Sequence, residues 1–208
     1  MKTEPIENSP AYLETVSGIL QSYLKTFPAE TEALAALASQ LREEGPSICQ
    51  RRNFRGHLTA SALFVDTIAS TALLVHHRSL DIWIQPGGHL DPDELPESGA
   101  FREFTEETGI TGVRAADWHR DYEIPLDIDT HFIPANALKG EESHYHHDFL
   151  YVLVADRPES AEINIKRDEL INYKFVEIAE LIKSPEPKLA RVASKLGEYG
   201  KLSGRTTV

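Results

Sequence analysis

The chain has 208 residues, of which 41% are hydrophobic, and carries 33 acidic against 21 basic side chains for a formal net charge of −12. This length and apolar content allow one domain of generous size, or one domain with an extension. The negative charge argues against duplex nucleic acid or an anionic membrane surface as the main partner, but it allows a small phosphorylated substrate held through a metal ion.

Cysteine usage and the start of the chain bear on the compartment. Cys49 is the single cysteine, so no internal disulfide bond can form. The opening residues MKTEPIENSP are acidic and contain proline, unlike a signal peptide. No apolar run reaches the roughly 18 residues that a membrane-spanning helix requires. We therefore expect a cytoplasmic protein with no membrane contact.

Two helices are expected between residues 10 and 44. The apolar residues that recur there at helical spacing are Leu13, Val16, Leu20, Leu34, Leu37 and Leu41. The segment "FPAE" interrupts the pattern, and "EEGPS" ends it. The pattern predicts a helical hairpin.

This hairpin divides the chain into an N-terminal helical extension, residues 1–45, and a main domain, residues 46–208. Its apolar side needs a surface to cover. That surface is either the chain's own core or a second copy in a homodimer, the commonest protein assembly. We expect the hairpin to dock on its own core and to shape one wall of a cleft or contribute to a dimer interface.

Strands dominate from Gly56 onward. The expected strands are "HLTASALFVD" at 57–66, "STALLVHH" at 70–77, "DIWIQPGGH" at 81–89, the segment 112–134, "HHDFLYVLVAD" at 146–156 and "INYKFVEI" at 171–178. Helices are expected at 97–109, 178–184 and 187–199. Strands mixed with one central and two closing helices predict an α+β fold, with a mixed sheet covered by helices.

The central helix, "ESGAFREFTEETG", has two distinct sides. At about 100° per residue, Glu103, Glu106 and Glu107 fall on one side. The residues that fall on another side and can pack on a sheet are Ala100, Phe101, Phe104 and Thr108. We expect the carboxylate side to take no part in packing, and we expect Gly109 to end the helix.

Three carboxylates at this spacing repel one another unless a cation lies between them. Hard oxygen ligands favour Mg²⁺ or Mn²⁺ over zinc. Arg102 can hold a carboxylate in place, and the turn at Gly87 and Gly88 lets a carbonyl oxygen approach the same metal. The pattern predicts metal-assisted attack of water on a phosphate, with a solvated acidic face as the alternative.

The spacing of the whole segment is typical of a known signature. Gly88 is followed by five residues and Glu94, then by seven residues and Arg102-Glu103-Phe104-Thr105-Glu106-Glu107-Thr108-Gly109-Ile110. This segment resembles the Nudix box of hydrolases that act on a nucleoside diphosphate linked to another group. The resemblance implies the Nudix fold, an α/β/α sandwich with a mixed sheet, and a pyrophosphohydrolase activity that depends on Mg²⁺ or Mn²⁺.

The resemblance also implies roles for single residues. The expected metal ligands are Gly87 through its carbonyl, Glu103, Glu106 and Glu107, and the expected catalytic residues are Glu103, Arg102 and Glu106. Arg102 would orient a metal-binding glutamate, and Glu94 would lie at the edge of the metal site. The general base varies in this family, and Glu103 is the first candidate.

A second group of polar residues lies downstream. On one strand, alternation would place Asp127, Asp129 and His131 on a single face. On a second strand, the same alternation would place His144, His146 and Asp148 on a single face. The two strands could pair through a loop at 135–143. The segments "RGHLTASA" and "WIQPGGH" resemble a bacterial Nudix subgroup with an incompletely defined substrate.

Within that subgroup, the residues expected to line the substrate cleft, contact phosphate or bind an extra metal are His131, His144, His146 and Asp129. The alternative is that they form cross-strand hydrogen bonds. We expect His57 and His89 to orient or hydrogen-bond their neighbours and not to act as ligands, so His89 is placed with Glu94 around the metal site. Two other functions on the same fold are a ligand-sensing domain without catalysis and an isoprenoid-diphosphate isomerase.

Overall fold

The structure is a computed structural model that describes residues 9–137, 140–155 and 163–202. Its strands are β1 (His57–Asp66), β2 (Thr71–His77), β3 (Ile82–Ile84), β4 (Gly87–His89), β5 (Val113–Ala115), β6 (Asp127–Ile133), β7 (His144–Ala155) and β8 (Leu170–Glu177). Its helices are α1 (Pro10–Thr26), α2 (Ala35–Glu44), α3 (Pro96–Thr108), α4 (Asp117–Tyr122), α5 (Ile178–Leu181) and α6 (Pro187–Leu202). Two short 3₁₀ turns, η1 (Pro28–Glu30) and η2 (Gly45–Cys49), follow α1 and α2.

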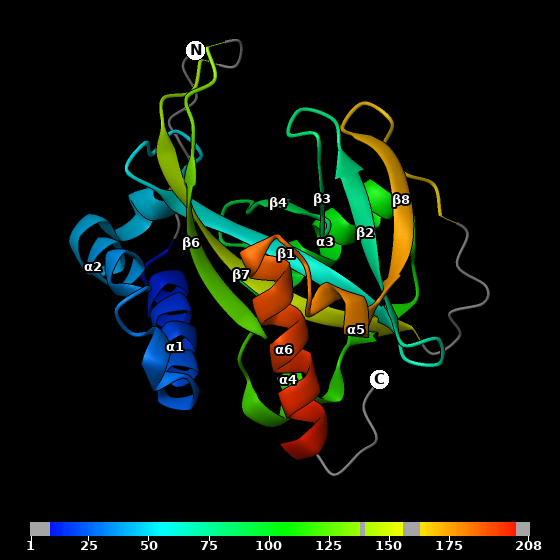
Figure 1. Cartoon of the computed structure of the whole chain (residues 1–208). Coiled ribbons are helices and arrows are strands. Elements are labelled where there is room, and N and C mark those ends of the chain that lie inside the picture. The colour runs from blue at the N-terminus through cyan, green and yellow to red at the C-terminus, as the bar shows by residue number, and fades with distance from the viewer. Residues whose placement is uncertain (1–8, 138–139, 156–162, 203–208) are drawn as a thin grey trace.

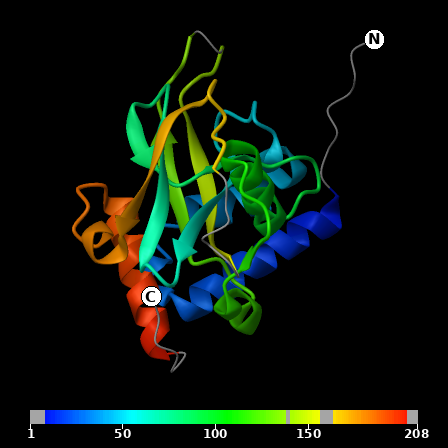
Figure 2. The same cartoon turned by 90° about the vertical axis from the view of Figure 1, so that its right-hand side faces the viewer.

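The strands form one mixed sheet between helices. The order is β3-β2-β1-β7-β5, while β4, β6 and β8 pair with β1, β7 and β2. Helix α6 lies on one face and α3 on the other (Figure 1), and the view turned by 90° shows the sheet between them (Figure 2). The predicted α+β sandwich is confirmed.

The centre of the sheet is the parallel pair β1 and β7, in register from His57 opposite His146 to Val65 opposite Val154. Both strands are almost continuously buried, as expected for strands covered on both faces. On the edge that faces away from this central pair, each of the two strands pairs with one strand near its start and with another near its end. β1 pairs with β4 and then with β2, and β7 pairs with β6 and then with β5. The β4 and β6 ends therefore flank the starts of β1 and β7.

Helix α3 is fixed by its apolar side. Ala100 and Phe104 are fully buried, and the Phe104 ring stacks on Phe64 of β1 with 5.6 Å between ring centroids. Gly109 ends the helix in the left-handed region at φ +72, where a side chain would be strained. The predicted helix and its stop are confirmed.

The N-terminal hairpin packs on the chain's own core. Val16, Tyr23 and Leu37 are buried in the same cluster as the strands. The buried Lys195 of α6 donates to the Tyr23 hydroxyl and to Asp127 at 2.6 Å. Helices α1 and α2 lie together beside the sheet (Figure 1). The expected docking is confirmed, while the homodimer remains a prediction.

One predicted segment was wrong. Residues 112–134 were expected as strands, but Asp117–Tyr122 form α4 between β5 and β6. His119 explains the helix, because its Nδ1 donates to the carbonyl of Ile124 at 2.8 Å and its Nε2 accepts from the Val152 amide at 2.7 Å. Residues 1–8, which carry most of the acidic start, lie outside the described residues. Among the helices that the structure describes, none has the length and apolar character needed to cross a membrane.

Candidate functional site

Two of the three clustered glutamates of α3, Glu103 and Glu107, meet the glycines of β4. The carboxylate of Glu107 accepts the Gly87 amide at 3.1 Å, and a Cβ built on Gly88 would lie 2.6 Å from the Glu103 carboxylate. Glu106 is about half exposed, with 49% of its side chain accessible, but Glu107 is only 3% exposed. The expectation that the whole carboxylate side takes no part in packing is therefore wrong for Glu107, because the close approach of β4 covers it.

Arg102 organises the neighbouring acids. Its guanidinium donates two bonds to Glu94, at 2.9 and 2.8 Å, and one to Glu103 at 2.9 Å. A further N–H donates to the carbonyl of His89 at 2.8 Å, and Glu106 lies 3.6 Å away. The planar fork of arginine suits such simultaneous contacts. Arg102 thus holds Glu94 and Glu103 in place, while their expected roles around a metal ion stay predictions.

Burial makes Glu103 and Glu107 costly to ionise. Burial raises the pKa of Glu107 to about 8, with the negative charge of Glu103 adding to the rise and the Gly87 amide opposing it. Burial also raises the pKa of Glu103, against the attraction of Arg102. A cation among the three carboxylates would offset this cost. The donor set fits Mg²⁺ or Mn²⁺, which prefer carboxylate oxygens.

An acidic residue outside the predicted set lies close to the site. The Lys166 amide donates to the carbonyl of Glu107 at 2.9 Å, and the Lys166 side chain pairs with Glu169 at 2.6 Å. The negative charge of Glu169 contributes to the raised pKa of both Glu103 and Glu107. No motif or periodicity marks Glu169 in the sequence, since only the folding of residues 163–169 against the end of α3 brings it here.

The histidine cluster, as we name it, comprises His57, His89, His131, His144 and His146. Strand pairing explains its formation. His146 of β7 stands opposite His57 of β1 and opposite His131 of β6, and His89 of β4 pairs with Thr59, two residues beyond His57. The centroid of the His57 ring lies 4.7 Å from that of His146 and 5.0 Å from that of His89. The predicted antiparallel pairing of 127–133 with 144–150 is confirmed, and the structure adds His57 and His89 to the histidines it brings together.

The aspartates on the same strands contact α6. Arg191 donates to Asp127 at 3.0 and 2.7 Å and to Asp129 at 2.8 Å. The other oxygen of Asp129 lies 2.8 Å from Nδ1 of His131. Burial raises the pKa of Asp129, but the hydrogen bond to His131 and the charges of Lys188 and Arg191 outweigh it, so the net pKa lies well below its usual range. Asp129 is thus an ionised acceptor that fixes the His131 ring.

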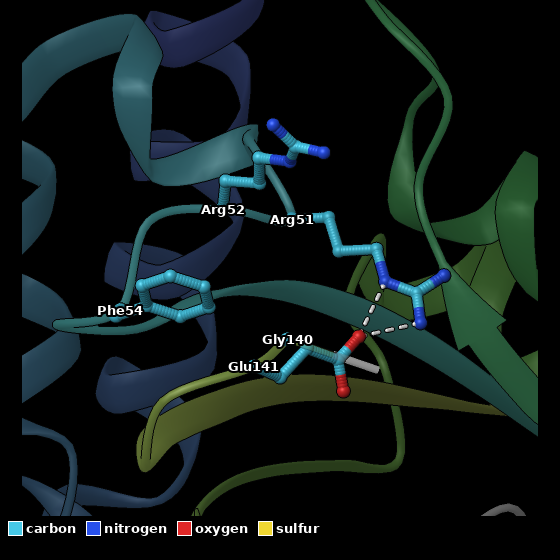
Figure 3. Close-up of a pocket in the computed structure, with 5 residues that line it drawn as sticks. All are labelled: Arg51, Arg52, Phe54, Gly140 and Glu141. Carbon is cyan, nitrogen blue, oxygen red and sulfur yellow. Dashed lines mark hydrogen bonds and ion pairs between the residues drawn. The ribbon is translucent and has the colours of Figure 1, made fainter. Parts of the chain in front are cut away.

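A cavity of about 530 Å³ opens at the histidine end of β7 and not at the clustered glutamates. Its lining residues are Arg51, Arg52, Phe54, Gly140 and Glu141. Figure 3 shows Arg51 reaching one carboxylate oxygen of Glu141 through two N–H groups, at 3.1 and 2.7 Å. The Phe54 ring lies 5.8 Å from that of His144, so the cavity adjoins the histidine cluster. None of these lining residues was predicted.

Most of the chain is similar to known proteins. A family model described as "NUDIX domain" matches residues 56–197. The m7GpppN-mRNA hydrolase NUDT17 of Bos taurus is 28% identical over 138 residues, which are 64% of this chain and 43% of that protein. A probable DHNTP pyrophosphohydrolase of Lactococcus lactis subsp. cremoris (strain MG1363) is 30% identical over 129 residues, which are 62% of this chain and 67% of that protein.

A solved structure agrees at the level of the fold. A hydrolase of the NUDIX family from Clostridium perfringens superposes with a TM-score of 0.50 and 21% sequence identity, over 69% of this chain and 97% of that one. Such similarity shows the fold alone. The chain spans less than half the length of NUDT17, at 43%.

Proposed function

The chain belongs to the Nudix family, and from this premise we propose that it is a pyrophosphohydrolase that needs Mg²⁺ or Mn²⁺ and cleaves a diphosphate linkage in a small phosphorylated substrate. The observation that carries the proposal is a group of four glutamates beside Arg102 and β4, which we call the acidic set: Glu94, Glu103, Glu106 and Glu107. Glu103 and Glu107 are held against β4 although their burial raises both pKa values, a cost that a bound cation would offset.

The chain's own residues then have separate roles. When bound, the metal supplies Lewis-acid stabilisation of the charge that gathers on the phosphate oxygens. Glu103, Glu106, Glu107 and the Gly87 carbonyl would hold it. The Gly87 amide holds Glu107 in place, and Arg102 holds Glu103. Glu103 is the first candidate to take the proton of the attacking water.

The substrate is proposed to carry a base or another planar group next to its phosphates. NUDT17 is described as an m7GpppN-mRNA hydrolase, and the Lactococcus protein as a probable DHNTP pyrophosphohydrolase. In this chain, Phe54 could stack on such a ring while Arg51 and Arg52 attract phosphate. His131, His144 and His146 are proposed to line the cleft between this cavity and β4, with Asp129 orienting His131.

The test is a screen of nucleoside triphosphates, dinucleoside polyphosphates, cap analogues, nucleotide sugars and small diphosphates, each with Mg²⁺. Release of a phosphate ester or of pyrophosphate supports the proposal. Binding without release would favour the ligand-sensing alternative, and rearrangement of an isoprenoid diphosphate with both phosphates intact would favour the isomerase.

A matched pair of variants assigns any activity to the site. Glu106→Gln should lower turnover by roughly 10²–10³-fold, because it removes one charge from the metal-binding set. Glu97→Gln makes the same chemical change at an exposed position in the first turn of α3 and should leave turnover unchanged. Equal rates in both variants would contradict the proposed metal site.

A further inference from the structure

Three histidines from three strands converge on one point. Each of His57, His89 and His146 offers a ring nitrogen, and these three atoms all lie within 4.8 Å of one another. Tetrahedral Zn²⁺ holds nitrogen ligands at 2.0–2.1 Å, so its ligand atoms are about 3.3 Å apart. Small side-chain rotations would bring the three nitrogen atoms from their present separations of up to 4.8 Å to this distance. β1, β4 and β7 are joined by backbone hydrogen bonds, so the three side chains start from a rigid frame.

Hydrogen bonds leave His57 prepared to bind an ion. Its Nδ1 lies 3.3 Å from the carbonyl oxygen of Asn53 and donates to it, so the neutral ring carries a lone pair on Nε2. His57 is 1% exposed, and its Nε2 has no hydrogen-bond partner among the described residues. A buried acceptor without a partner is costly, and metal-binding histidines almost always donate their other nitrogen in this way.

Two neighbouring histidines show the same arrangement. Nδ1 of His144 donates to the carbonyl of Glu142 at 2.7 Å, and Nε2 of His144 lies 3.2 Å from Nε2 of His146. Nδ1 of His131 contacts the Asp129 carboxylate at 2.8 Å.

We propose that His57, His89 and His146 form a binding site for a divalent first-row transition-metal ion, Zn²⁺ in the first place, with His144 or water in the fourth position. Neutral imidazoles suit such ions and not Mg²⁺. His89 and His146 are partly exposed, so the ion can enter from solvent. Three protein ligands with an open fourth position are typical of a zinc site that binds a further group.

This site is separate from the clustered glutamates. Successive side chains of a strand point to opposite faces of the sheet. A Cβ on Gly88 would meet Glu103 of α3, so the adjacent His89 points to the other face, as do Thr59 and His57 on the paired strand. Two metal ions of different chemistry would therefore lie on either side of β4. The expectation that His57 and His89 only orient their neighbours differs from this proposal, since the sequence showed each of them alone.

The experiment measures metal binding directly on the full, untagged chain, stripped with chelator and kept in excess Mg²⁺ to occupy the glutamates. Titration with Zn²⁺ against a chromophoric chelator should show one tight site per chain. Co²⁺ should give the visible absorption bands of a low-coordinate site with nitrogen ligands. Neither readout needs a substrate, so the result does not depend on the proposed hydrolase activity.

Variants locate the ion. His57→Gln and His146→Gln should weaken Zn²⁺ binding by about 100-fold or more, since loss of even an outer hydrogen-bond partner costs 10–100-fold. His76→Gln at the end of β2 and Glu106→Gln on α3 should bind Zn²⁺ like the wild type. If circular dichroism shows that His57→Gln is unfolded, His89→Gln at its partly exposed position replaces it. Equal Zn²⁺ affinity in the wild type and the folded cluster variants, or loss of the tight site in Glu106→Gln alone, would overturn the proposal.

Discussion

Arg102 donates hydrogen bonds to two glutamates and one backbone carbonyl at once, so its geometry matters as much as its charge. A lysine keeps the charge but cannot make the paired N–H bonds to Glu94 together with those to Glu103 and the His89 carbonyl. Arg102→Lys should therefore weaken Mn²⁺ binding by about 10–100-fold while the fold persists. Isothermal titration measures the affinity.

The control for this variant is Arg114→Lys. Arg114 is an exposed residue of β5 that pairs with Asp117 at 2.9 Å, away from the acidic set. An Mn²⁺ affinity in Arg102→Lys equal to that in Arg114→Lys would show that Arg102 does not organise the metal ligands.

His119 gives a pH dependence to folding. Burial lowers its pKa from 6.5 to about 4, although the hydrogen bond that the ring donates to the Ile124 carbonyl opposes this shift. Above pH 6.5 the ring is neutral in both states. As the pH falls from 6.5 toward 4, the unfolded chain takes up a proton that the folded chain does not, so the free energy of unfolding falls by about 2 kcal/mol between pH 7 and pH 5.

Urea unfolding at several pH values measures this loss. His119→Gln should make the decline between pH 7 and pH 5 shallower by that amount, whereas His76→Gln, at a partly exposed strand end, should not. The same slope in all three proteins would show that the His119 ring is protonated as readily in the folded chain as in the unfolded one.

At the scale of elements, β4 lies unusually close to its neighbours on two sides. A Cβ on Gly87 would lie 2.5 Å from the Ser61 Cβ and 2.7 Å from the Ala60 carbonyl oxygen, whereas the nearest atoms to one on Gly88 belong to the carboxylate end of Glu103. Neither glycine has a left-handed backbone, so space alone decides. Gly87→Ala should cost about 1–3 kcal/mol of stability. Gly88→Ala should keep most stability but weaken Mn²⁺ binding, because the flexible Glu103 side chain can move away.

Melting temperature and Mn²⁺ titration separate the two effects. The control is Gly18→Ala in α1, where a new Cβ has no atom within 4 Å and alanine favours the helix. A Gly88→Ala protein with unchanged Mn²⁺ affinity, or a Gly87→Ala protein as stable as the wild type, would contradict this account of β4.

Local patterns explain which elements could be predicted. The strand 57–66 and helix α3 follow from alternation, helical spacing and the stop at Gly109, all of which act over short distances. Helix α4 was missed because the buried His119, which bonds the backbone of Ile124 nearby and of the distant Val152, stabilises a polar six-residue helix. Tertiary contacts of this kind leave no periodic signal in the sequence.

At the scale of the whole molecule, the parts of the site that depend on tertiary contacts could not be predicted from the sequence either. The acidic set lies within one helix and its flanking turn, so its spacing was visible. The histidine cluster depends on the register of four strands, and the α6 cations that hold Asp127, Asp129 and Asp148 come from a segment at least 40 residues away. Only the pairing of 127–133 with 144–150, two neighbouring segments, could be anticipated.

The N-terminal hairpin is connected to the histidine cluster through Gln40. Its side-chain amide donates to the Gly56 carbonyl at 2.7 Å, and its oxygen accepts from His147 at 3.0 Å. Gly56 precedes His57, and His147 follows His146. Nδ1 of His147 accepts from Thr130 of β6 at 2.9 Å. The hairpin is thus hydrogen-bonded to the residues at the starts of β1 and β7. We expect it to stabilise the domain.

Removal of residues 1–45 should therefore lower the melting temperature strongly or prevent folding, because it exposes the core positions that Val16, Tyr23 and Leu37 cover and leaves Lys195 without its Tyr23 and Glu30 partners. Leu37→Ala tests the same contact in the full chain and should cost about 2–5 kcal/mol, since this side chain is fully buried. Leu24→Ala, at a partly buried position of α1, should cost less. Sedimentation reports whether the truncated chain also changes its assembly. The truncated protein could instead keep the melting temperature, the assembly state and the metal affinity of the full chain. That result would show that the hairpin supports neither the core nor the site.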